Sequence, residues 1–577
     1  MNSRFDPRRG DIEDDASSPK SKSMLALAGS LLVELSFPKL IVAWIFLLII
    51  PGLTLGLAPM IVSAWINMIS GKITSPFSGI WPASALILLA LGAWYGWRAL
   101  FRLAETSFWS LASLVVQPAY TTCREGVRHI FELLLPEEST RASSRARIRS
   151  ITSIVAGVVI CSISLVILLA TWPKAELFGD IREIASLKQL VIVALANSVI
   201  VVSGYLAAGG LIWAVADGTM DQPRDLESFD AGSANGKQWR IVHLSDIHVV
   251  GERYGFRIES GRLGPQGNER LRRVLDQIEI IDARQPLDTI LITGDMTDAG
   301  RSAEWAEFTD LLAAYPHLKD RILMIPGNHD LNIVDRANPA RMELPTSPNP
   351  KLRQIRTLNA ISSLQGDRVR IVDYAKGEIG GTLNETMAPH FVKLARFSDS
   401  ARPFLFKDLS EIWNAVFPMV QPPDKEDGLG VILLNSNAPT HFSFTNALGT
   451  ISAEQLRGIE IAIAQYPRAC WIIALHHHVV EYPRAAKALS ERVGTALING
   501  NWFVRQLKPL ANRAVLMHGH RHVDWIGRCA DLFIVSAPSP VMEAIDNLPT
   551  YFYIHTVELS SSGHLVLLRP ERVEVPG

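Results

Sequence analysis

The stretch that decides the fold is R-I-L-M-I-P-G-N-H-D, residues 321–330. Its four consecutive apolar residues, 322–325, predict a short buried strand. The Pro-Gly pair at 326–327 then breaks the strand, so that the Asn-His-Asp tripeptide at 328–330 stands at its exit. Open α/β sheets collect their chemistry at strand exits, so this stretch indicates a functional site at a sheet edge.

Four other apolar runs end in the same way, namely residues 239–245, 289–293, 470–475 and 515–517. Each run is followed at once by side chains that can bind metal. These side chains are Asp246 and His248, then Asp295, then His476, His477 and His478, and finally His518, His520 and His522. Segments of helical periodicity alternate with the strands, at 270–281, 303–314 and 453–464. The alternation predicts an α/β sheet with helices on both faces.

The composition limits the classes of function. The chain has 577 residues, which indicates more than one domain. Its formal net charge of −1 does not favour a polyanionic partner such as nucleic acid. The four cysteines are far apart, which predicts neither a zinc knuckle nor a disulfide framework. The mean hydropathy of +0.17 is high for a soluble protein, and the apolar excess lies in the first part of the chain.

The first part of the chain predicts an α-helical transmembrane region of about four spans. Residues 1–39 form a polar tail and lead-in, and residues 40–216 hold the apolar runs. The predicted spans lie near 40–66, 82–97, 151–172 and 190–216. Buried core helices of a soluble protein are the alternative, but uncharged runs of this length seldom have another use than crossing a bilayer.

Lysine and arginine in the short connections predict the orientation. The segment between the second and third predicted spans is rich in arginine, whereas the other two connections hold few basic residues. The tail and everything after Ala216 are therefore expected in the cytoplasm, in a protein of the plasma (inner) membrane. If the apolar patch at 108–116 also spans, the count becomes odd and the orientation inverts.

Residues 217–238 predict a linker because they are rich in Asp, Gly and Ser. Residues 239–577 then form the predicted α/β domain. Within it, residues 331–430 interrupt the alternation of strands and helices. This segment begins just after Asn328 and could cap the site, with a surface insertion as the equal alternative.

Histidines gather at the strand exits. Nine of the fifteen lie in or beside them, namely His243, His248, His329, His476, His477, His478, His518, His520 and His522. Scattered histidines are usually surface or core residues, but here carboxylates and Asn328 stand at the same exits. Asp, Asn and His without Cys form a ligand set that suits Mn, Fe, Zn or Mg rather than a structural thiolate zinc.

These motifs resemble the calcineurin-like metallophosphoesterases from residue 239 to the C-terminus. Asp246-x-His248, Gly294-Asp295, the G-N-H-D at 327–330, the His476 cluster and Gly519-His520-x-His522 stand in the order of that family. The T-G-D-M-T-D-A-G at 293–300 resembles the cyclic-nucleotide phosphodiesterase branch. Protein Ser/Thr phosphatases would instead show Asp-Arg-Gly after the Gly-Asp, and Gly-Asn-His-Glu.

The resemblance implies a four-layer α/β/β/α sandwich that binds two divalent metal ions, with Mn, Fe or Zn expected and Mg as a further option. The implied ligands are Asp246, His248 and His522 for the first ion, Asn328, His476 and His520 for the second, and Asp295 for both. Such ions sit about 3.5–4 Å apart and lower the pKa of a bridging water.

The resemblance also implies the catalytic residues. His329 would be the general acid for the leaving oxygen, and Asp330 would orient it. Three histidines precede Val479 here, where relatives often have a proline after the histidine cluster. His476 fits the ligand position best, and His477 is the runner-up.

The sequence therefore predicts a membrane-anchored, two-metal phosphoesterase that hydrolyses a phosphodiester by attack of a metal-bridging hydroxide. The expected substrate is a small-molecule or lipid-linked phosphate ester, such as a cyclic nucleotide or a nucleotide-linked lipid precursor. One alternative is a catalytically weak membrane sensor that binds a ligand, although every ligand position is intact. Another is a nuclease, although no basic stripe accompanies the motifs.

Overall fold

The computed structural model describes residues 41, 45, 49–73, 117–133, 142–178 and 184–577, the last range with short gaps. The gaps are residues 185, 231, 233–235, 261–263, 336–340, 345–346, 401–405, 442, 484–496, 543–547 and 561–562. The described chain falls into two compact units, Ser36–Met220 and Asp221–Gly577. The predicted tail at 1–39, the predicted span at 82–97 and the apolar patch at 108–116 lie outside the described residues.

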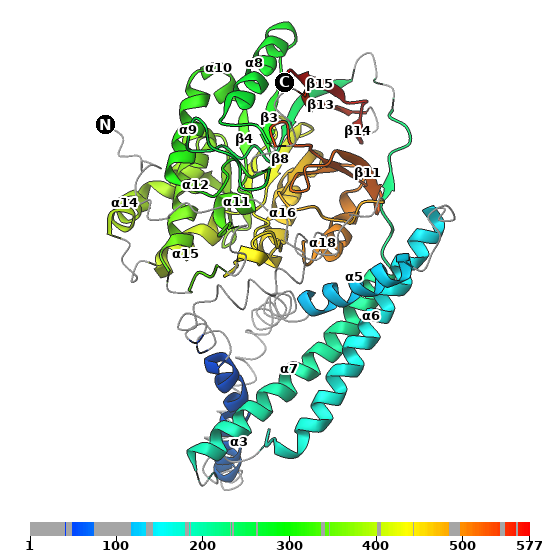
Figure 1. The fold of residues 1–577 in the computed structure, drawn as a ribbon, viewed down its shortest axis with the longest axis vertical. Coiled ribbons are helices and arrows are strands. Elements are labelled where there is room, and N and C mark those ends of the chain that lie inside the picture. The colour runs from blue at the N-terminus through cyan, green and yellow to red at the C-terminus, as the bar shows by residue number, and fades with distance from the viewer. Residues whose placement is uncertain are drawn as a thin grey trace. The chain divides into compact units, whose positions relative to one another are not determined.

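Two mixed sheets form the Asp221–Gly577 unit (Figure 1). The nine-stranded sheet has the order β1 (Arg224–Asp225), β11 (Trp525–Cys529), β12 (Leu532–Ser536), β10 (Ala514–His518), β9 (Cys470–Ala474), β8 (Leu429–Leu433), β7 (Met419–Gln421), β5 (Arg370–Asp373) and β6 (Glu378–Thr382). The six-stranded sheet has the order β14 (Leu565–Leu567), β13 (Thr550–Leu559), β2 (Lys237–Leu244), β3 (Thr289–Ile292) and β4 (Ile322–Met324), with β15 (Glu571–Val575) paired to β13. One hydrophobic core holds side chains of both sheets, which confirms the predicted α/β sandwich.

The apolar runs form strands because they are buried. All three residues of β4 are almost fully enclosed, as are all five of β9 and of β10. β2, β3 and β4 pair in parallel, and so do β8, β9, β10 and β12. Parallel pairing brings the carboxyl ends of neighbouring strands to the same edge of the sheet. The polar residues that follow the strands are therefore collected at these edges.

Helices pack into the same core where the periodicity predicts them (Figure 1). α8 (Glu269–Arg284) buries the predicted stripe that includes Leu271 and Leu275. α9 (Ser302–Ala313) and α16 (Ala453–Gln465) contain the other two predicted segments. Other described helices of this unit include α10 (Pro316–Lys319) and α18 (Gly500–Leu507).

Residues 331–430 are integrated into the larger sheet. They supply β5, β6 and β7 and the helices α12 (Asn349–Gln365), α13 (Leu383–Met387), α14 (Phe391–Ser400) and α15 (Phe406–Ala415). Arg353 Nε donates to the Leu331 carbonyl at 2.7 Å, and Arg356 Nη1 donates to the Gly300 carbonyl at 3.0 Å. α12 is thus tied to the loops that follow β3 and β4. The role of the segment as a cap stays a prediction.

The Ser36–Met220 unit is helical. Its described helices are α3 (Ile50–Ile73), α5 (Gln117–Leu133), α6 (Ala142–Thr171) and α7 (Leu187–Gly218). α6 and α7 pack closely, because a Cβ added to Gly157 would lie 2.6 Å from the Gly210 carbonyl oxygen. At the end of α7, Asp217 accepts a hydrogen bond from Arg124 of α5 at 2.6 Å.

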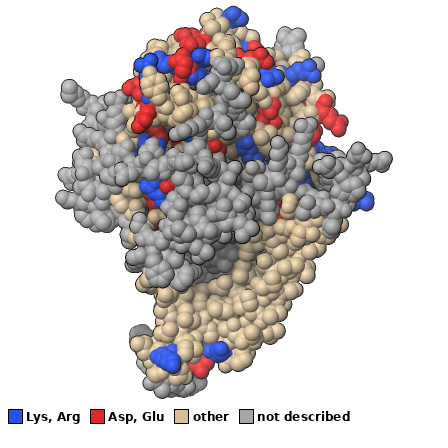
Figure 2. Space-filling view, in the orientation of Figure 1, with Lys and Arg blue, Asp and Glu red and all other residues tan. Residues whose placement is uncertain are grey.

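Two helices in the described residues are long and apolar enough to cross a membrane, Arg147–Lys174 and Leu187–Gly218. Their apolar side chains face outward, with Val166 and Leu169 exposed by 66% and 68%. Figure 2 shows a surface almost free of charge along this unit. Within the described residues the prediction of four spans is corrected to two such helices, and the predicted span at 82–97 lies outside those residues. The apolar part of α3, Ile50–Trp65, is shorter than the roughly 20 residues that a span needs.

Candidate metal centre

The strand exits of both sheets converge on one buried cluster. Asp246 and His248 follow β2, Asp295 follows β3, and Asn328 begins the single-turn helix α11 (Asn328–Leu331) after β4. From the larger sheet, His476 follows β9, and His520 and His522 follow β10. Five of these seven residues are buried, and His520 and His522 are half-buried. The structure therefore brings every predicted ligand residue together.

The predicted ligands fall into two groups of ligand atoms. Asp246, His248 and His522 form one, and Asp295, His476 and His520 form the other. His248 also forms a third group with Asp298 and His329, which are not predicted ligands. Within each group the ligand atoms lie within 4.8 Å of one another. Asn328 joins the second group, since its Oδ1 lies 3.0 Å from His476 Nε2. This division of residues is the one that the family resemblance implies.

Two carboxylates connect the groups. Asp295 Oδ2 lies 3.2 Å from His476 Nε2 and 3.7 Å from His248 Nε2, which belong to different groups. Asp246 Oδ2 accepts a hydrogen bond of 2.9 Å from the backbone N–H of His520. Asp295 is thus placed between the two groups, as a bridging ligand must be.

Five of the seven ligand residues have left-handed backbones. The φ values are 56° for Asp246, 50° for His248, 52° for Asp295, 77° for His520 and 54° for His522. A non-glycine residue in this region costs on the order of 1–3 kcal/mol and persists only where its surroundings enforce it. Strain of this kind gathers at functional sites, where it turns side chains that leave different strands toward one point.

Glycines allow the strand exits to approach one another. A Cβ on Gly294 would lie 2.4 Å from His476 Nδ1, and one on Gly327 would lie 2.1 Å from Asp295 Oδ1. Gly294 also has a φ of 101°, which disfavours a side chain there in any case. The Gly-Asp and Gly-Asn pairs in the sequence are therefore required by close packing around the ligands.

Hydrogen bonds of the histidine rings determine which ring nitrogen faces the cluster. His476 Nδ1 donates to the Thr293 carbonyl at 2.7 Å, so its Nε2 faces the oxygens of Asp295 and Asn328. His477 instead places Nδ1 2.8 Å from Ser436 Oγ, beside the cluster. These contacts favour His476 over His477 as the ligand.

His329 and Asp330 have separate surroundings. His329 Nδ1 donates to the Asp298 carbonyl at 2.7 Å, and its Nε2 lies 3.5 Å from Glu259 Oε1. The Asp330 carboxylate accepts hydrogen bonds from the backbone N–H groups of Thr297 and Gly327, each at 2.9 Å. None of these hydrogen bonds joins Asp330 to His329, so they do not support the expectation that Asp330 orients His329. Asp330 instead fixes the loops that follow β3 and β4.

The charges around His329 set its protonation. Burial alone would lower its pKa, but the carboxylates of Asp295, Glu259 and Asp298 raise the pKa to about 10. Burial raises the pKa of Asp330 to about 6, with Asp295 contributing in the same direction. The His329 ring therefore holds a proton at neutral pH in the metal-free protein.

Two further carboxylates touch the cluster and were missed in the sequence. Asp298 Oδ1 lies 3.4 Å from His248 Nδ1, and Asp298 Oδ2 accepts a 2.8 Å hydrogen bond from the Ile258 backbone. Glu259 reaches His329 and also His522, whose Nε2 is 3.9 Å from Glu259 Oε2. Asp298 stands in the motif at 293–300, where its spacing could have marked it, whereas the segment around Glu259 has no periodicity.

The residues present fit a pair of metal ions. Both ring nitrogens of His248 are buried and make no hydrogen bond with the described residues. A buried unpaired ring nitrogen is costly, and a metal–ligand bond would satisfy it. The donors are imidazole nitrogens and carboxylate or amide oxygens, which suits divalent ions.

Comparison with known proteins agrees with this chemistry. Residues 240–524 match the family profile of calcineurin-like phosphoesterases, so this segment forms a calcineurin-like metallophosphoesterase domain. No functionally curated protein matches the chain.

Among solved structures, a candidate 5′-nucleotidase from Staphylococcus aureus in complex with α-ketoglutarate has 13% identity and a TM-score of 0.30, over 59% of this chain and 55% of its own. A dimetal phosphatase from Danio rerio has 11% identity and a TM-score of 0.34, over 59% of this chain and 98% of its own. A purple acid phosphatase from yellow lupin (Lupinus luteus) seeds has 12% identity and a TM-score of 0.24, over 56% and 50%. The chain thus spans only about half of the first and third of these proteins.

Proposed function

We propose that this protein is a two-metal phosphoesterase that hydrolyses a phosphodiester and is anchored to a membrane by its apolar helices. The observation that carries the proposal is the pair of buried ligand groups joined by Asp295, within a domain that matches the calcineurin-like phosphoesterases. The same ligands would serve a sensor that only binds a phosphate ester, so turnover is the decisive measurement.

The ligand residues would hold the ions as two sets. Asp246, His248 and His522 would hold one ion, and Asn328, His476 and His520 the other, with Asp295 shared. Divalent ions in such a site supply Lewis acidity and a water of lowered pKa. Asp298 would fix the ring of His248, because a carboxylate behind a ligand histidine sets its orientation and raises its basicity.

His329 would act as the general acid that protonates the leaving oxygen. It follows Asn328 directly, and its Nδ1–H is held by the Asp298 carbonyl, which leaves Nε2 facing Glu259 at the cluster. A general acid in this position protonates the alkoxide as it leaves. The Asp298 carbonyl therefore orients the His329 ring. Asp330 acts only indirectly, by holding the loop.

The position of Glu259 favours a diester over a monoester. Its side chain is 27% exposed, stands beside His329 and His522, and carries a negative charge. A phosphomonoester is a dianion at neutral pH and a phosphodiester a monoanion, so the carboxylate repels the monoester more. A cyclic nucleotide, a nucleotide-linked lipid precursor or another small diester meets this condition, and we infer that the substrate is one of these.

A substrate panel tests the proposal. The full-length protein, loaded with Mn, Fe or Zn, is assayed on bis-p-nitrophenyl phosphate, p-nitrophenyl phosphate, cyclic nucleotides and single-stranded DNA. We expect bis-p-nitrophenyl phosphate and the cyclic nucleotides to be cleaved fastest. Binding of DNA with a steep salt dependence would favour the nuclease instead, and tight binding of esters without turnover would favour the sensor.

The variant Glu259→Gln tests the diester preference. We expect the ratio of diester to monoester turnover to fall about fivefold to tenfold. One unit of charge at ~7 Å amounts to roughly 2 kcal/mol at an effective dielectric constant of about 20, and solvent screening at a partly exposed group reduces this. Glu574→Gln, on the exposed strand β15, is the matched control. An unchanged ratio would remove Glu259 from the argument.

The membrane part of the proposal rests on α6 and α7, which combine length, apolarity and outward-facing apolar side chains. The arginine-rich connection before α6 supports a cytoplasmic catalytic unit under the positive-inside rule. A reporter that is active only in the cytoplasm, fused after Gly577, should be active. An external signal would invert the orientation.

A further inference from the structure

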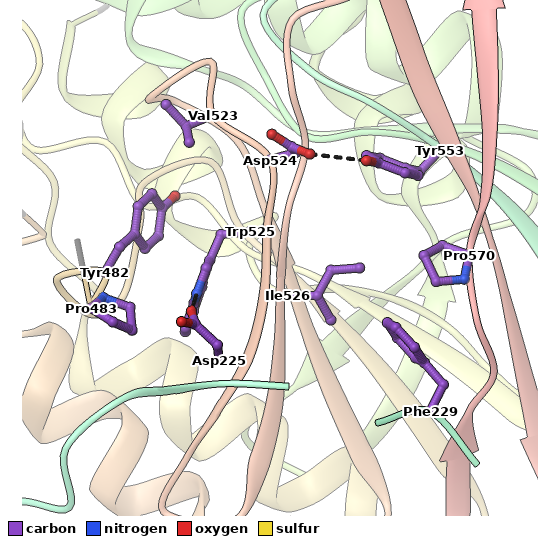
Figure 3. A pocket seen from close by; sticks show the side chains of 10 residues that line it. All are labelled: Asp225, Phe229, Tyr482, Pro483, Val523, Asp524, Trp525, Ile526, Tyr553 and Pro570. Atoms are coloured by element: carbon purple, nitrogen blue, oxygen red, sulfur yellow. Dashed lines mark hydrogen bonds between the residues drawn. The ribbon is translucent and has the colours of Figure 1, made fainter. Parts of the chain in front are cut away.

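A cavity separate from the metal centre lies next to the loop that carries His520 and His522. It has a volume of about 430 Å³, within the range of roughly 300–1,000 Å³ that small-molecule sites occupy. Its lining comes from both sheets, with Asp225 in β1, Trp525 in β11 and Tyr553 in β13 (Figure 3). The phosphoesterase function proposed above does not use it.

Aromatic rings form two sides of this cavity. Figure 3 shows Tyr482 and Trp525 on one side and Tyr553 and Phe229 on the other. Tyr482 and Trp525 stack with ring centroids 5.0 Å apart and an interplanar angle of 30°. Tyr482 and Trp525 are buried, so their positions are fixed by packing before any ligand arrives. The negative faces of such rings attract cations.

Two carboxylates complete the lining. Asp225 Oδ1 accepts a hydrogen bond from Trp525 Nε1 at 2.8 Å. Asp524 accepts hydrogen bonds from the hydroxyl groups of Tyr553 at 2.9 Å and Tyr551 at 3.2 Å. All three donors are neutral, so these hydrogen bonds orient the carboxylates without cancelling their charge. Among the ten residues that line the cavity, none is Lys or Arg.

The chain already places its own cations on rings at this cavity. The Arg521 guanidinium stands 5.6 Å from the ring centroid of Tyr482, and that of Arg572 stands 4.0 Å from the centroid of Tyr551. Arg521 is at the same time held by both carboxylate oxygens of Glu481, at 2.9 and 3.0 Å. These pairs show that the local field favours positive charge on aromatic faces.

We propose that this cavity binds a small organic cation of the alkylammonium class. Aromatic faces and carboxylates together select a soft, weakly hydrated cation over a metal ion, because cation–π contacts need an apolar cation surface. The ten described residues that line the cavity include no basic side chain that would hold a phosphate, so the ligand is a free amine or quaternary ammonium rather than a phosphocholine headgroup. The site is independent of the phosphoesterase chemistry.

Calorimetric titration of the full-length protein with choline tests the proposal. The neutral isostere 3,3-dimethyl-1-butanol, which replaces the nitrogen by carbon, is the matched control ligand. We expect saturable binding of choline, binding of the isostere at least about tenfold weaker, and weaker binding of glycerophosphocholine than of choline. Equal binding of choline and the isostere, or no saturable binding, would overturn the cation site. Equal or tighter binding of glycerophosphocholine would overturn the choice of a free cation.

Variants locate the binding. The double variant Asp225→Asn with Asp524→Asn keeps the shape of both side chains and removes their charge, and we expect choline affinity to fall at least about tenfold. Asp424→Asn, an exposed carboxylate outside the cavity, should leave the affinity unchanged. Unchanged affinity in the double variant would overturn the proposal. If the double variant does not fold, the comparison of choline with its isostere in the unaltered protein still decides the question.

Discussion

The two sheets supply unlike halves of the metal centre. The exits of β2, β3 and β4 bring Asp246 and Asp295 together with an amide and an imidazole, whereas the exits of β9 and β10 bring imidazoles only. The smaller sheet therefore contributes the negative charge that divalent ions require, and the larger sheet contributes neutral donors. Neither half is a site alone, so the packing of the two sheets against each other makes the centre.

The difference also divides the histidines. Burial lowers the pKa of His476, but Asp295 outweighs it and raises the pKa to about 9. His478 and His518 lie on the same sheet, and there burial dominates and lowers the pKa to about 4 and about 3. His476 thus differs from His478 and His518 because the Asp295 carboxylate lies 3.2 Å from its Nε2. Metal binding requires the neutral form, so His476 must lose its proton as an ion enters, whereas burial already lowers the pKa of His248 and His520.

The variant Asp295→Asn should have the largest effect, because this residue joins the halves. We expect loss of activity by more than the about 10⁴-fold that a general acid contributes at most, together with fewer than two ions per chain. Turnover and metal content by mass spectrometry are measured on the same samples. Full metal content with normal turnover would contradict the description of the metal centre as two halves joined by Asp295.

His329 belongs to the smaller-sheet half but is not a ligand in this arrangement. The variant His329→Ala should keep both ions and lose about 10²–10⁴-fold in rate on an alkyl or nucleoside ester. The loss should be much smaller on a nitrophenyl ester, whose leaving group departs without a proton. Turnover numbers for both esters in both proteins make the comparison. Equal losses would mean that His329 only positions the phosphate.

Asp298 sharpens the comparison within the smaller-sheet half, because it touches His248 but not the larger-sheet histidines in the described contacts. The variant Asp298→Asn should weaken metal binding about 10- to 100-fold. The loss should affect the ion held by His248 and leave the ion held by His476. Chelator titration resolves the two affinities. Equal weakening of both would show that Asp298 acts through the loops instead.

The sequence predicted the strands, the helices and the residues that meet at the sheet edges. Apolar runs bounded by Gly and Pro encode strands locally, and parallel pairing brings their exits together. The bridging role of Asp295 was expected from the family resemblance, and it stays a prediction.

Other features depend on contacts between distant segments. Glu259 approaches His329 from an irregular segment. The His329 ring donates its hydrogen bond to the carbonyl of Asp298 and not to the carboxylate of Asp330. Backbone carbonyls leave no trace in residue identity. The left-handed backbones of the ligands are invisible in the sequence for a similar reason, since Asp and His seldom adopt them without tertiary support. Two of the four predicted spans are helices long and apolar enough to cross a membrane, and the predicted span at 82–97 lies outside the described residues.

The smallest expected effect concerns a histidine away from the carboxylates. His555 on β13 is buried, and burial lowers its pKa to about 3. The unfolded chain has a histidine pKa near 6.5, so below that pH the unfolded state binds the proton and the folded state does not. The stability contributed by neutral His555 is present above pH 6.5 and is lost as the pH falls from 6.5 toward 3. Between pH 7.5 and 5.5 this amounts to about 1.4 kcal/mol.

The variant His555→Gln removes this titration, so its unfolding free energy should fall less between pH 7.5 and 5.5 than that of the unaltered protein. His564→Gln, in the exposed turn before β14, is the matched control and should leave the pH dependence unchanged. Denaturant unfolding at the two pH values measures the difference. A pH dependence equal in all three proteins would mean that His555 is protonated in the folded state. Its environment would then resemble that of His476, and the division of histidines by their distance from the carboxylates would fail.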